Sequence, residues 1–193
     1  MGSPARATSD DEAAPAHDAS PARLRAIVDA NFDFIWRSLR RLGVAEHSVD
    51  DAAQQVWIVA ARKLASITPG QERAFLFGTA LRVASDARRT ASRRREVLAD
   101  GEDDGPIDQA PRADQQLDDR RARALLDDVL AAMPIELRAV FVLFELEELP
   151  VLEIAALLGV PAGTASSRLR RAREEFQQIV KRMRARGAIG GER

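Results

Sequence analysis

Apolar residues recur every three to four positions along most of this chain, and no stretch alternates apolar and polar residues as a half-buried strand does. The helical spacing comes in blocks, first over Leu24 to Leu42, then over Val49 to Leu64, and then over Phe75 to Ala87. Further blocks follow between residues 117 and 186. Because helices with one apolar stripe must bury it against each other, the sequence predicts an all-α fold.

Composition divides the predicted helices into two small domains. Residues 97–116 are acidic, contain glycine and proline, and predict a flexible linker, which at ~3.3 Å per residue could span roughly 65 Å and let the two domains sit well apart. We expect a three-to-four-helix N-terminal domain over 21–96 and a C-terminal helix-turn-helix domain over 117–186. Residues 1–20 predict a disordered arm, and 187–193 a short tail.

Charge is strongly segregated, although the formal net charge is only −1. Residues 82–95 contain six arginines against one aspartate, and residues 161–186 contain eight basic residues against two glutamates. Between them, residues 100–119 contain eight acidic residues against one arginine. Clustered arginines are typical of nucleic-acid binding, and the alternative is an ordinary solvated face.

Several function classes are excluded by what the sequence lacks. The chain has no cysteine, and two isolated histidines, His17 and His47, cannot form a metal cage, so we expect no metal and no cofactor. No apolar run approaches the ~18–20 residues of a membrane span, and the N-terminus lacks a secretory signal, which predicts a cytoplasmic protein without membrane insertion. An enzyme using Asp50 and Asp51 is disfavoured, because neither has a partnered base and no glycine-rich phosphate loop is present. We therefore expect no catalytic residue and no small-molecule substrate.

Helix boundaries are marked by local signals. Ser20 followed by Pro21 predicts an N-cap and a first helical position. Ser48 with Asp51 three residues later forms a capping-box pattern. Gly70 follows a proline and predicts a turn with positive φ.

The C-terminal half carries the most informative pattern. A short apolar helix over residues 151–158, a turn at Gly159 and an arginine-rich helix have the form of a helix-turn-helix. With Ala165, Leu169 and Ala172 facing inward, the outward arc of the second helix consists of small or basic residues. These outward residues are Gly163, Thr164, Ser166, Ser167, Arg170 and Arg171. Small side chains allow close approach to a major groove, and arginine binds phosphate or guanine.

Four ordered stretches resemble one family, the extracytoplasmic-function (ECF) group of bacterial sigma-70-type RNA polymerase sigma factors. Residues 133–141 (MPIELRAVF) resemble the family's LPxxxRxVFxL sequence, and residues 153–173 resemble its EIAxxLGxSxGTVxSRLxRAR signature. Residues 50–57 (DDAAQQVW) resemble the AEDxxQExF polymerase-binding helix. Residues 75–89 resemble the WLxxIAxNxxxDxxRR helix of the promoter-melting region.

The chain departs from the family pattern at five positions. Proline stands at Pro150 and Pro161 where the family usually has serine caps. Gln55 replaces a glutamate, Phe75 a tryptophan and Arg82 an asparagine. The prolines still suit helix entry through their fixed φ, whereas core affinity and promoter choice are expected to differ from the family pattern.

The resemblance implies a transcription initiation subunit whose partners are core RNA polymerase, promoter DNA and an anti-sigma factor. The matched residues for docking on core polymerase are Asp50, Asp51, Gln54, Gln55 and Trp57. Those for the −10 element are Ser66, Arg73, Arg82, Asp86, Arg88 and Arg89. Those for the −35 element are Gly163, Thr164, Ser166, Ser167, Arg168, Arg170 and Arg171.

The sequence leaves other interpretations open for three aromatic residues, for the linker and for the function of the protein. Trp57 could serve only core packing, and for Phe75 and Phe77 packing in the core is favoured over capture of an unstacked base. The linker could be a plain solvated spacer. An autonomous helix-turn-helix regulator would explain residues 117–186, but it would leave the N-terminal domain and its DDAAQQVW helix without a role.

Overall fold

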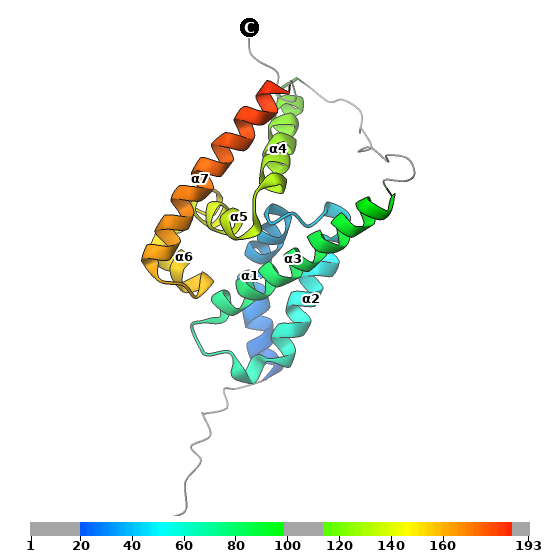
Figure 1. Ribbon diagram of the computed structural model, residues 1–193. Helices are drawn as coiled ribbons and strands as arrows, with labels where there is room; N and C mark the ends of the chain where they lie inside the picture. Colours follow the sequence, from blue (N-terminus) through cyan, green and yellow to red (C-terminus); the bar gives the residue numbers. More distant parts are fainter. Residues whose placement is uncertain (1–19, 99–113, 187–193) are drawn as a thin grey trace, which may run out of the picture.

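The computed structural model describes residues 20–98 and 114–186, and every regular element in those two ranges is a helix (Figure 1). The predicted all-α fold is confirmed for these residues. The N-terminal bundle comprises α1 (Pro21–Arg41), α2 (Val49–Arg62) and α3 (Glu72–Leu98), with short 3₁₀ turns at Glu46–Ser48 and Leu64–Ser66. The C-terminal unit comprises α4 (Asp114–Ala132), α5 (Ile135–Phe141), a π-helical turn (Val142–Leu146), α6 (Val151–Leu158) and α7 (Ala162–Ala185).

Parts of the predicted organisation lie outside the described residues. These are the N-terminal arm apart from Ser20, residues 99–113 of the linker, and the tail. Helix α3 continues to Leu98, and α4 begins at Asp114, so helical residues occupy both ends of the segment predicted as a linker.

The N-terminal bundle is built on the apolar stripes that the sequence shows. Ile35 and Leu39 of α1 are fully buried against α2 and α3, as are Val56 and Leu76 on those helices. Burying each such side chain contributes about 1.5–3 kcal/mol. Small residues let the helices approach closely, and this set comprises Ala52, Ala53, Ala60, Ala80 and Ala84.

The predicted helix boundaries are confirmed at three positions and wrong at one. The Ser20 hydroxyl accepts a hydrogen bond from the Arg23 backbone N–H at 3.2 Å. Gly70 has φ 85°, and Gly159 ends α6 in the left-handed conformation with φ 63°. The capping box at Ser48 does not form, because this residue already has helix-like φ and ψ at the end of a 3₁₀ turn and its hydroxyl makes no cap.

The C-terminal unit has a smaller core of its own. Val129 of α4 and Met133, which follows that helix, are buried in one cluster with Ile179 of α7. Helices α4 and α7 run side by side in Figure 1. The rings of Phe141 and Phe176 stack with their centroids 4.7 Å apart. Stacking of this kind fixes α7 on α5 beyond what apolar burial alone would do.

A feature that the sequence pattern does not reveal lies between α5 and α6. The helix widens into a π-helical turn over Val142–Leu146, and Glu148 then takes a left-handed conformation with φ 54°. A non-glycine residue in that conformation costs about 1–3 kcal/mol, so the surrounding contacts must hold this turn in place.

The two halves share one continuous core, although the length of the linker would let them sit apart. Helix α6 packs beside the first turns of α3 (Figure 1). Ile154 and Leu157 of α6 belong to the same buried cluster as Phe77 of α3 and Phe34 of α1. The apolar faces that α5 and α6 leave uncovered within their own half are therefore buried against the N-terminal bundle.

Candidate nucleic-acid interface

Helices α6 and α7 meet at Gly159 in the helix-turn-helix arrangement that the sequence predicts. Ala165, Leu169 and Ala172 are buried and fix the orientation of α7. Five of the seven residues predicted to contact the −35 element are exposed, namely Gly163, Ser166, Ser167, Arg170 and Arg171, while Thr164 and Arg168 are half-buried. A Cβ atom at Gly163 would meet no atom within 4 Å, so no neighbour within the protein requires a glycine here. One end of α7 therefore presents small and basic side chains to solvent.

On this surface, Arg170 makes an ion pair that is exposed to solvent. Arg170 pairs with Glu174 at 2.5 Å, and both side chains are more than half exposed. Such an exposed pair stabilises little and is readily exchanged for a phosphate. The Ser167 hydroxyl donates to the Thr164 carbonyl at 3.0 Å.

Arg173, which the sequence analysis did not single out for a contact, flanks this surface. It pairs with Glu145 at 2.6 Å and lies over the ring of Phe144, 4.9 Å from its centroid. Its position one turn beyond Arg170 and two turns beyond Ser166 follows from helical periodicity. Its partners come from the π-helical turn, which the sequence did not predict.

The N-terminal bundle places its acidic residues at the start of α2. Asp50 accepts a hydrogen bond from the indole N–H of Trp36 on α1 at 2.9 Å, while Asp51, Gln54 and Gln55 are exposed. Trp57 is half-buried against the core, so core packing holds for part of its ring. Four of the five residues predicted to dock on polymerase thus point outward along α2.

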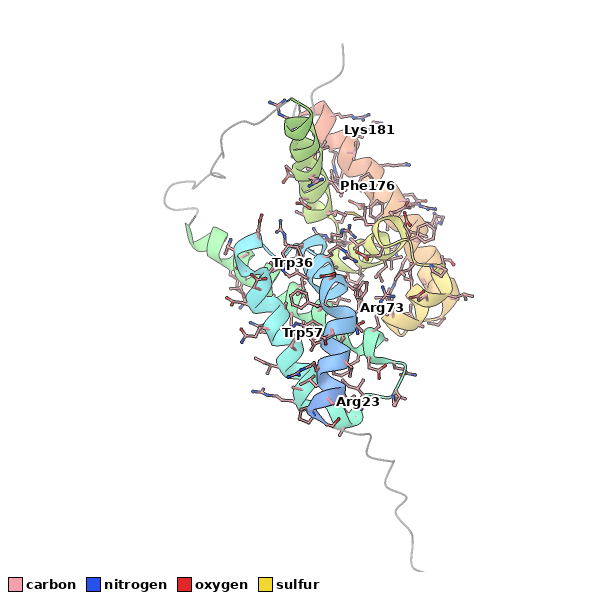
Figure 2. The ribbon with its side chains drawn as sticks, turned by 180° about the vertical axis from the view of Figure 1, so that it is seen from behind. Arg23, Trp36, Trp57, Arg73, Phe176 and Lys181 are labelled. Atoms are coloured by element: carbon pink, nitrogen blue, oxygen red, sulfur yellow. The ribbon has the colours of Figure 1, made fainter. Side chains whose placement is uncertain are left out.

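Two exposed apolar side chains lie beside this surface, and the sequence analysis did not predict them as part of it. Phe32 is 46% exposed and Ile58 is 42% exposed, and the ring of Phe32 stacks on Trp57 with 6.4 Å between centroids. Figure 2 shows Trp36 and Trp57 on neighbouring helices of the bundle. The signal was available, because Phe32 interrupts the polar face of α1 between Asp29 and Asp33. Exposed aromatic and aliphatic side chains that lie together are typical of a protein-binding surface.

The residues predicted for the −10 element divide into two groups. Arg82, Asp86 and Arg89 are exposed along α3, with Arg89 and Asp86 3.8 Å apart. The Ser66 hydroxyl is exposed but donates to the Lys63 carbonyl at 2.7 Å, which stabilises its own turn.

The second group, Arg73 and Arg88, is half-buried and contacts the C-terminal unit. Arg73 lies over the ring of Phe34, 4.0 Å from its centroid, and pairs with Glu153 of α6 at 3.2 Å. Figure 2 shows Arg73 where the N-terminal bundle meets α6. Arg88 donates to the Ala131 carbonyl at 3.1 Å, and burial lowers the pKa of this guanidinium. Only the tertiary arrangement brings Glu153 and Ala131 to these arginines.

The two phenylalanines of α3 lie on its core side. Phe77 is fully buried and packs on Phe34 with 5.9 Å between ring centroids. Phe75 is half-buried against the same core. The preference for core packing over base capture is confirmed for Phe77, because a ring with no exposed surface cannot stack on a base without unfolding its surroundings.

The loop before α3 is shaped by an arginine from α1. Arg23 donates to the carbonyls of Leu64 and Ile67, at 3.2 and 2.6 Å, and pairs with Glu72 at 3.3 Å. Although burial opposes it, hydrogen bonds from its own backbone N–H, from Arg23 and from Gly70 lower the pKa of Glu72. This network holds the loop in one shape.

Two properties of the described ranges bear on the class of site. In residues 20–98 and 114–186, no group of three or more histidines, cysteines or acidic residues could hold a metal ion. None of the helices placed there is long and apolar enough to cross a membrane.

Family models match both halves of the chain in order. The model for sigma-70 region 2 matches residues 27–94, and the model for sigma-70 region 4 matches residues 123–176. Two curated relatives are similar over most of the chain. The ECF RNA polymerase sigma factor SigE of Mycolicibacterium smegmatis is 31% identical over 175 residues, which are 90% of this chain and 65% of SigE. SigL of Mycobacterium tuberculosis H37Rv is 30% identical over 153 residues, which are 78% of this chain and 85% of SigL.

Solved structures share the fold. CnrH in complex with the cytosolic domain of CnrY superposes with a TM-score of 0.61 at 21% identity, covering 84% of this chain and 90% of CnrH. The sigma factor RpoE in complex with the anti-sigma factor NepR from Bartonella quintana gives 0.55 at 20% identity, covering 83% and 95%. At this identity the likeness shows the fold alone.

Proposed function

The chain belongs to the ECF group of sigma-70 family RNA polymerase sigma factors, and we propose that it binds core RNA polymerase and directs promoter-specific initiation by recognising −10 and −35 elements. The observation that carries the proposal is the match of region 2 and region 4 in order, with α6 and α7 forming a helix-turn-helix in the second. In this function the protein acts without a catalytic site of its own. Its place of action is the cytoplasm, because bacterial polymerase and promoter DNA are there.

The exposed surfaces of α2 and α7 support binding to two different partners. The outward side of α2, with Asp51, Gln54 and Ile58, offers acidic, amide and apolar groups for a protein partner. The exposed end of α7 offers small and basic groups for duplex DNA. Each contact alone is weak, and tethering both to one polymerase raises the effective concentration of each DNA site.

The first test is co-migration of the purified chain with bacterial core RNA polymerase, together with run-off transcription from its own upstream region. Stable binding and a defined start site are expected. Binding of the free chain to specific duplex DNA, without any binding to core polymerase, would contradict the proposal and favour an autonomous helix-turn-helix regulator.

The polymerase surface is tested by changing Gln54 and Ile58 together to alanine. Loss of an exposed apolar contact and an amide is expected to weaken core binding by roughly 10-fold or more, since a few central residues carry most of the energy of an interface. The measurement is a titration of labelled protein with core polymerase. Arg25→Ala on the exposed face of α1 is the control. Equal affinities for both variants would remove this part of α2 from the interface.

The −35 surface is tested by changing Arg170 and Arg171 together to alanine. A good bidentate contact of an arginine with a base contributes about 1–3 kcal/mol, so promoter use should fall. Loss of arginine contacts with phosphates should flatten the salt dependence of binding. Lys181→Ala with Arg184→Ala removes the same charge from the far end of α7 and should have little effect. Unchanged transcription from the first variant would remove both arginines from the site.

An anti-sigma factor is a further partner in this proposal. The two solved structures named above are complexes, and in one of them the sigma factor RpoE is bound to the anti-sigma factor NepR. A pull-down with the chain as bait, competed by core polymerase, would identify such a partner.

A further inference from the structure

The loop that joins α2 to α3 presents small and polar side chains to solvent. Leu64 and Ile67 are buried in the core of the bundle and attach the loop at two points. The other residues of 64–71 are exposed, and these are Ala65, Ser66, Thr68, Pro69, Gly70 and Gln71. Ser66 is among the residues predicted for the −10 element. The loop therefore offers hydroxyl and amide groups outward while its apolar side chains face the core.

The backbone of this loop is held by a side chain from another helix. Arg23 lies in the first turn of α1, and Figure 2 shows it at the lower end of the bundle. Its Nη1 atom donates to the Leu64 carbonyl at 3.2 Å, and its Nη2 atom donates to the Ile67 carbonyl at 2.6 Å. The side chain of Arg23 is only 15% exposed. Because the N–H groups of a planar guanidinium point in set directions, Arg23 holds both carbonyls in one relative orientation.

Glu72 completes the contact from the other end of the loop. Its Oε1 atom accepts from Nη2 of Arg23 at 3.3 Å, and its Oε2 atom accepts from the Gly70 N–H at 2.7 Å. The lowered pKa of Glu72 described above keeps this carboxylate charged at neutral pH. We call Arg23 and Glu72 the brace. The brace joins the 3₁₀ turn, the extended residue Ile67 and the turn at Gly70 to the first turn of α1.

The brace controls the orientation of the loop more than its attachment. Burial of Leu64 and Ile67 holds the loop on the bundle, but apolar burial has no directional requirement. The hydrogen bonds to the two carbonyls set the direction of the peptide groups between them, and with it the direction of the Ser66 side chain. Selection of an unstacked base requires donors and acceptors that are held in place, because a mobile group adapts to several base edges.

We propose that Arg23 is a positioning residue, which through the brace holds residues 64–71 in the shape that selects one unstacked base of the −10 element. The base contacts the exposed side chains of the loop, and Arg23 acts on it only through the loop backbone. This inference rests on the proposed function, because base selection has meaning only in a chain that opens a promoter. It adds to the site a residue that lies 41 and 44 positions away from the carbonyls it binds.

The first readout is base discrimination by the complex of the chain with core polymerase. The probes are fluorescein-labelled single strands that carry the −10 sequence mapped by run-off transcription, with each of the four bases in turn at every position. The parent complex should prefer one base at one or more positions. Arg23→Ala should lower this preference by roughly 10-fold, the discrimination that one well-placed contact to a base provides.

The matched control is Arg25→Ala. Arg25 is exposed on α1, so this variant removes the same charge at a position outside the brace and should keep the base preference. Arg23→Lys should restore part of the preference, because an ammonium can still donate to a carbonyl. An unchanged preference in Arg23→Ala, or an equal loss of affinity for all four bases, would overturn the proposal.

Glu72→Gln tests the brace with a smaller change. Only one of its two oxygen acceptors remains and the charge that faces Arg23 is lost, so the preference should fall less than with Arg23→Ala. Circular dichroism checks that each variant keeps the helical content of the parent chain. A folded Glu72→Gln variant with the full preference of the parent would overturn the part of Glu72 in the proposal.

A second readout follows the loop in the free chain by nuclear magnetic resonance. The backbone order parameters of residues 65–71 should be about 0.85 in the parent chain and fall below about 0.6 in Arg23→Ala, while those of α2 stay unchanged. Order parameters that do not respond to Arg23→Ala would overturn the brace.

Failure of this inference differs from failure of the proposed function. Initiation from the mapped start site, with a base preference that Arg23→Ala does not change, would overturn this inference alone. A chain that never binds core polymerase would refute the proposed function and the selection of a base together. The order parameters would then still show whether Arg23 holds the loop.

Discussion

Replacing Phe77 with alanine is expected to lower the free energy of unfolding by about 3–5 kcal/mol, the range for removing a large buried aromatic side chain. Phe77 is fully buried and packs on Phe34, so the change leaves a cavity at the centre of the bundle. The cavity lies in the cluster that both halves share, and the loss should appear in the main unfolding transition. Urea unfolding followed by circular dichroism measures it.

A matched control for Phe77 is Phe32→Ala, which removes the same side chain from an exposed position. Stability should change by less than about 0.5 kcal/mol, as is usual at the surface, while binding to core polymerase should weaken. A large loss of stability at Phe32, or none at Phe77, would contradict the assignment of one ring to the surface and the other to the core.

Replacing Gly43 with alanine is expected to be the other large effect. Gly43 has φ 100°, and it ends α1 with the Val44 N–H bonded to the Leu39 carbonyl at 3.0 Å. A side chain in such a conformation costs about 1–3 kcal/mol by itself. The new Cβ would also overlap the Nη1 atom of Arg138, so this buried guanidinium must move, at a further cost of about 1–3 kcal/mol.

Gly70→Ala separates the two contributions at Gly43. Gly70 has φ 85° but nothing lies within 4 Å of a Cβ built there, so this variant reports backbone strain alone. Combining Gly43→Ala with Arg138→Ala should recover the excess that the overlap causes. Equal losses of stability for Gly43→Ala and Gly70→Ala would mean that Arg138 does not lie against the end of α1 in solution.

The helices and their buried faces were predictable because they depend on local periodicity. The inward positions Ala165, Leu169 and Ala172 were assigned from the three-to-four-residue spacing, and all three are buried. The turns at Gly70 and Gly159 were predictable because glycine readily adopts positive φ. The capping box at Ser48 failed because hydroxyl capping requires an extended residue, and a preceding 3₁₀ turn removes that conformation.

The sequence indicated which residues of the predicted site face outward, but it did not indicate which residues from the other half lie beside them. The sequence placed Arg170 and Arg171 on an outward arc, and the structure exposes both. It could not show that Arg73 and Arg88 turn toward the other half, because their partners, Glu153 and Ala131, are more than 40 residues away. Phe32 and Ile58 were missed because an exposed apolar residue becomes a surface feature only when its neighbours on another helix are known.

The sequence by itself determined the helical class, the inward faces of the helices and the family, since each depends on residues that are close in the chain or in a fixed order. The tertiary structure decided how the two halves meet. Glu147, Arg37, Arg41 and Arg138 form no pattern in the sequence, because roughly 100 residues separate the partners in each contact. Their interaction arises only when the uncovered apolar faces of α5 and α6 are buried on the N-terminal bundle, which brings these charges together where the two halves meet.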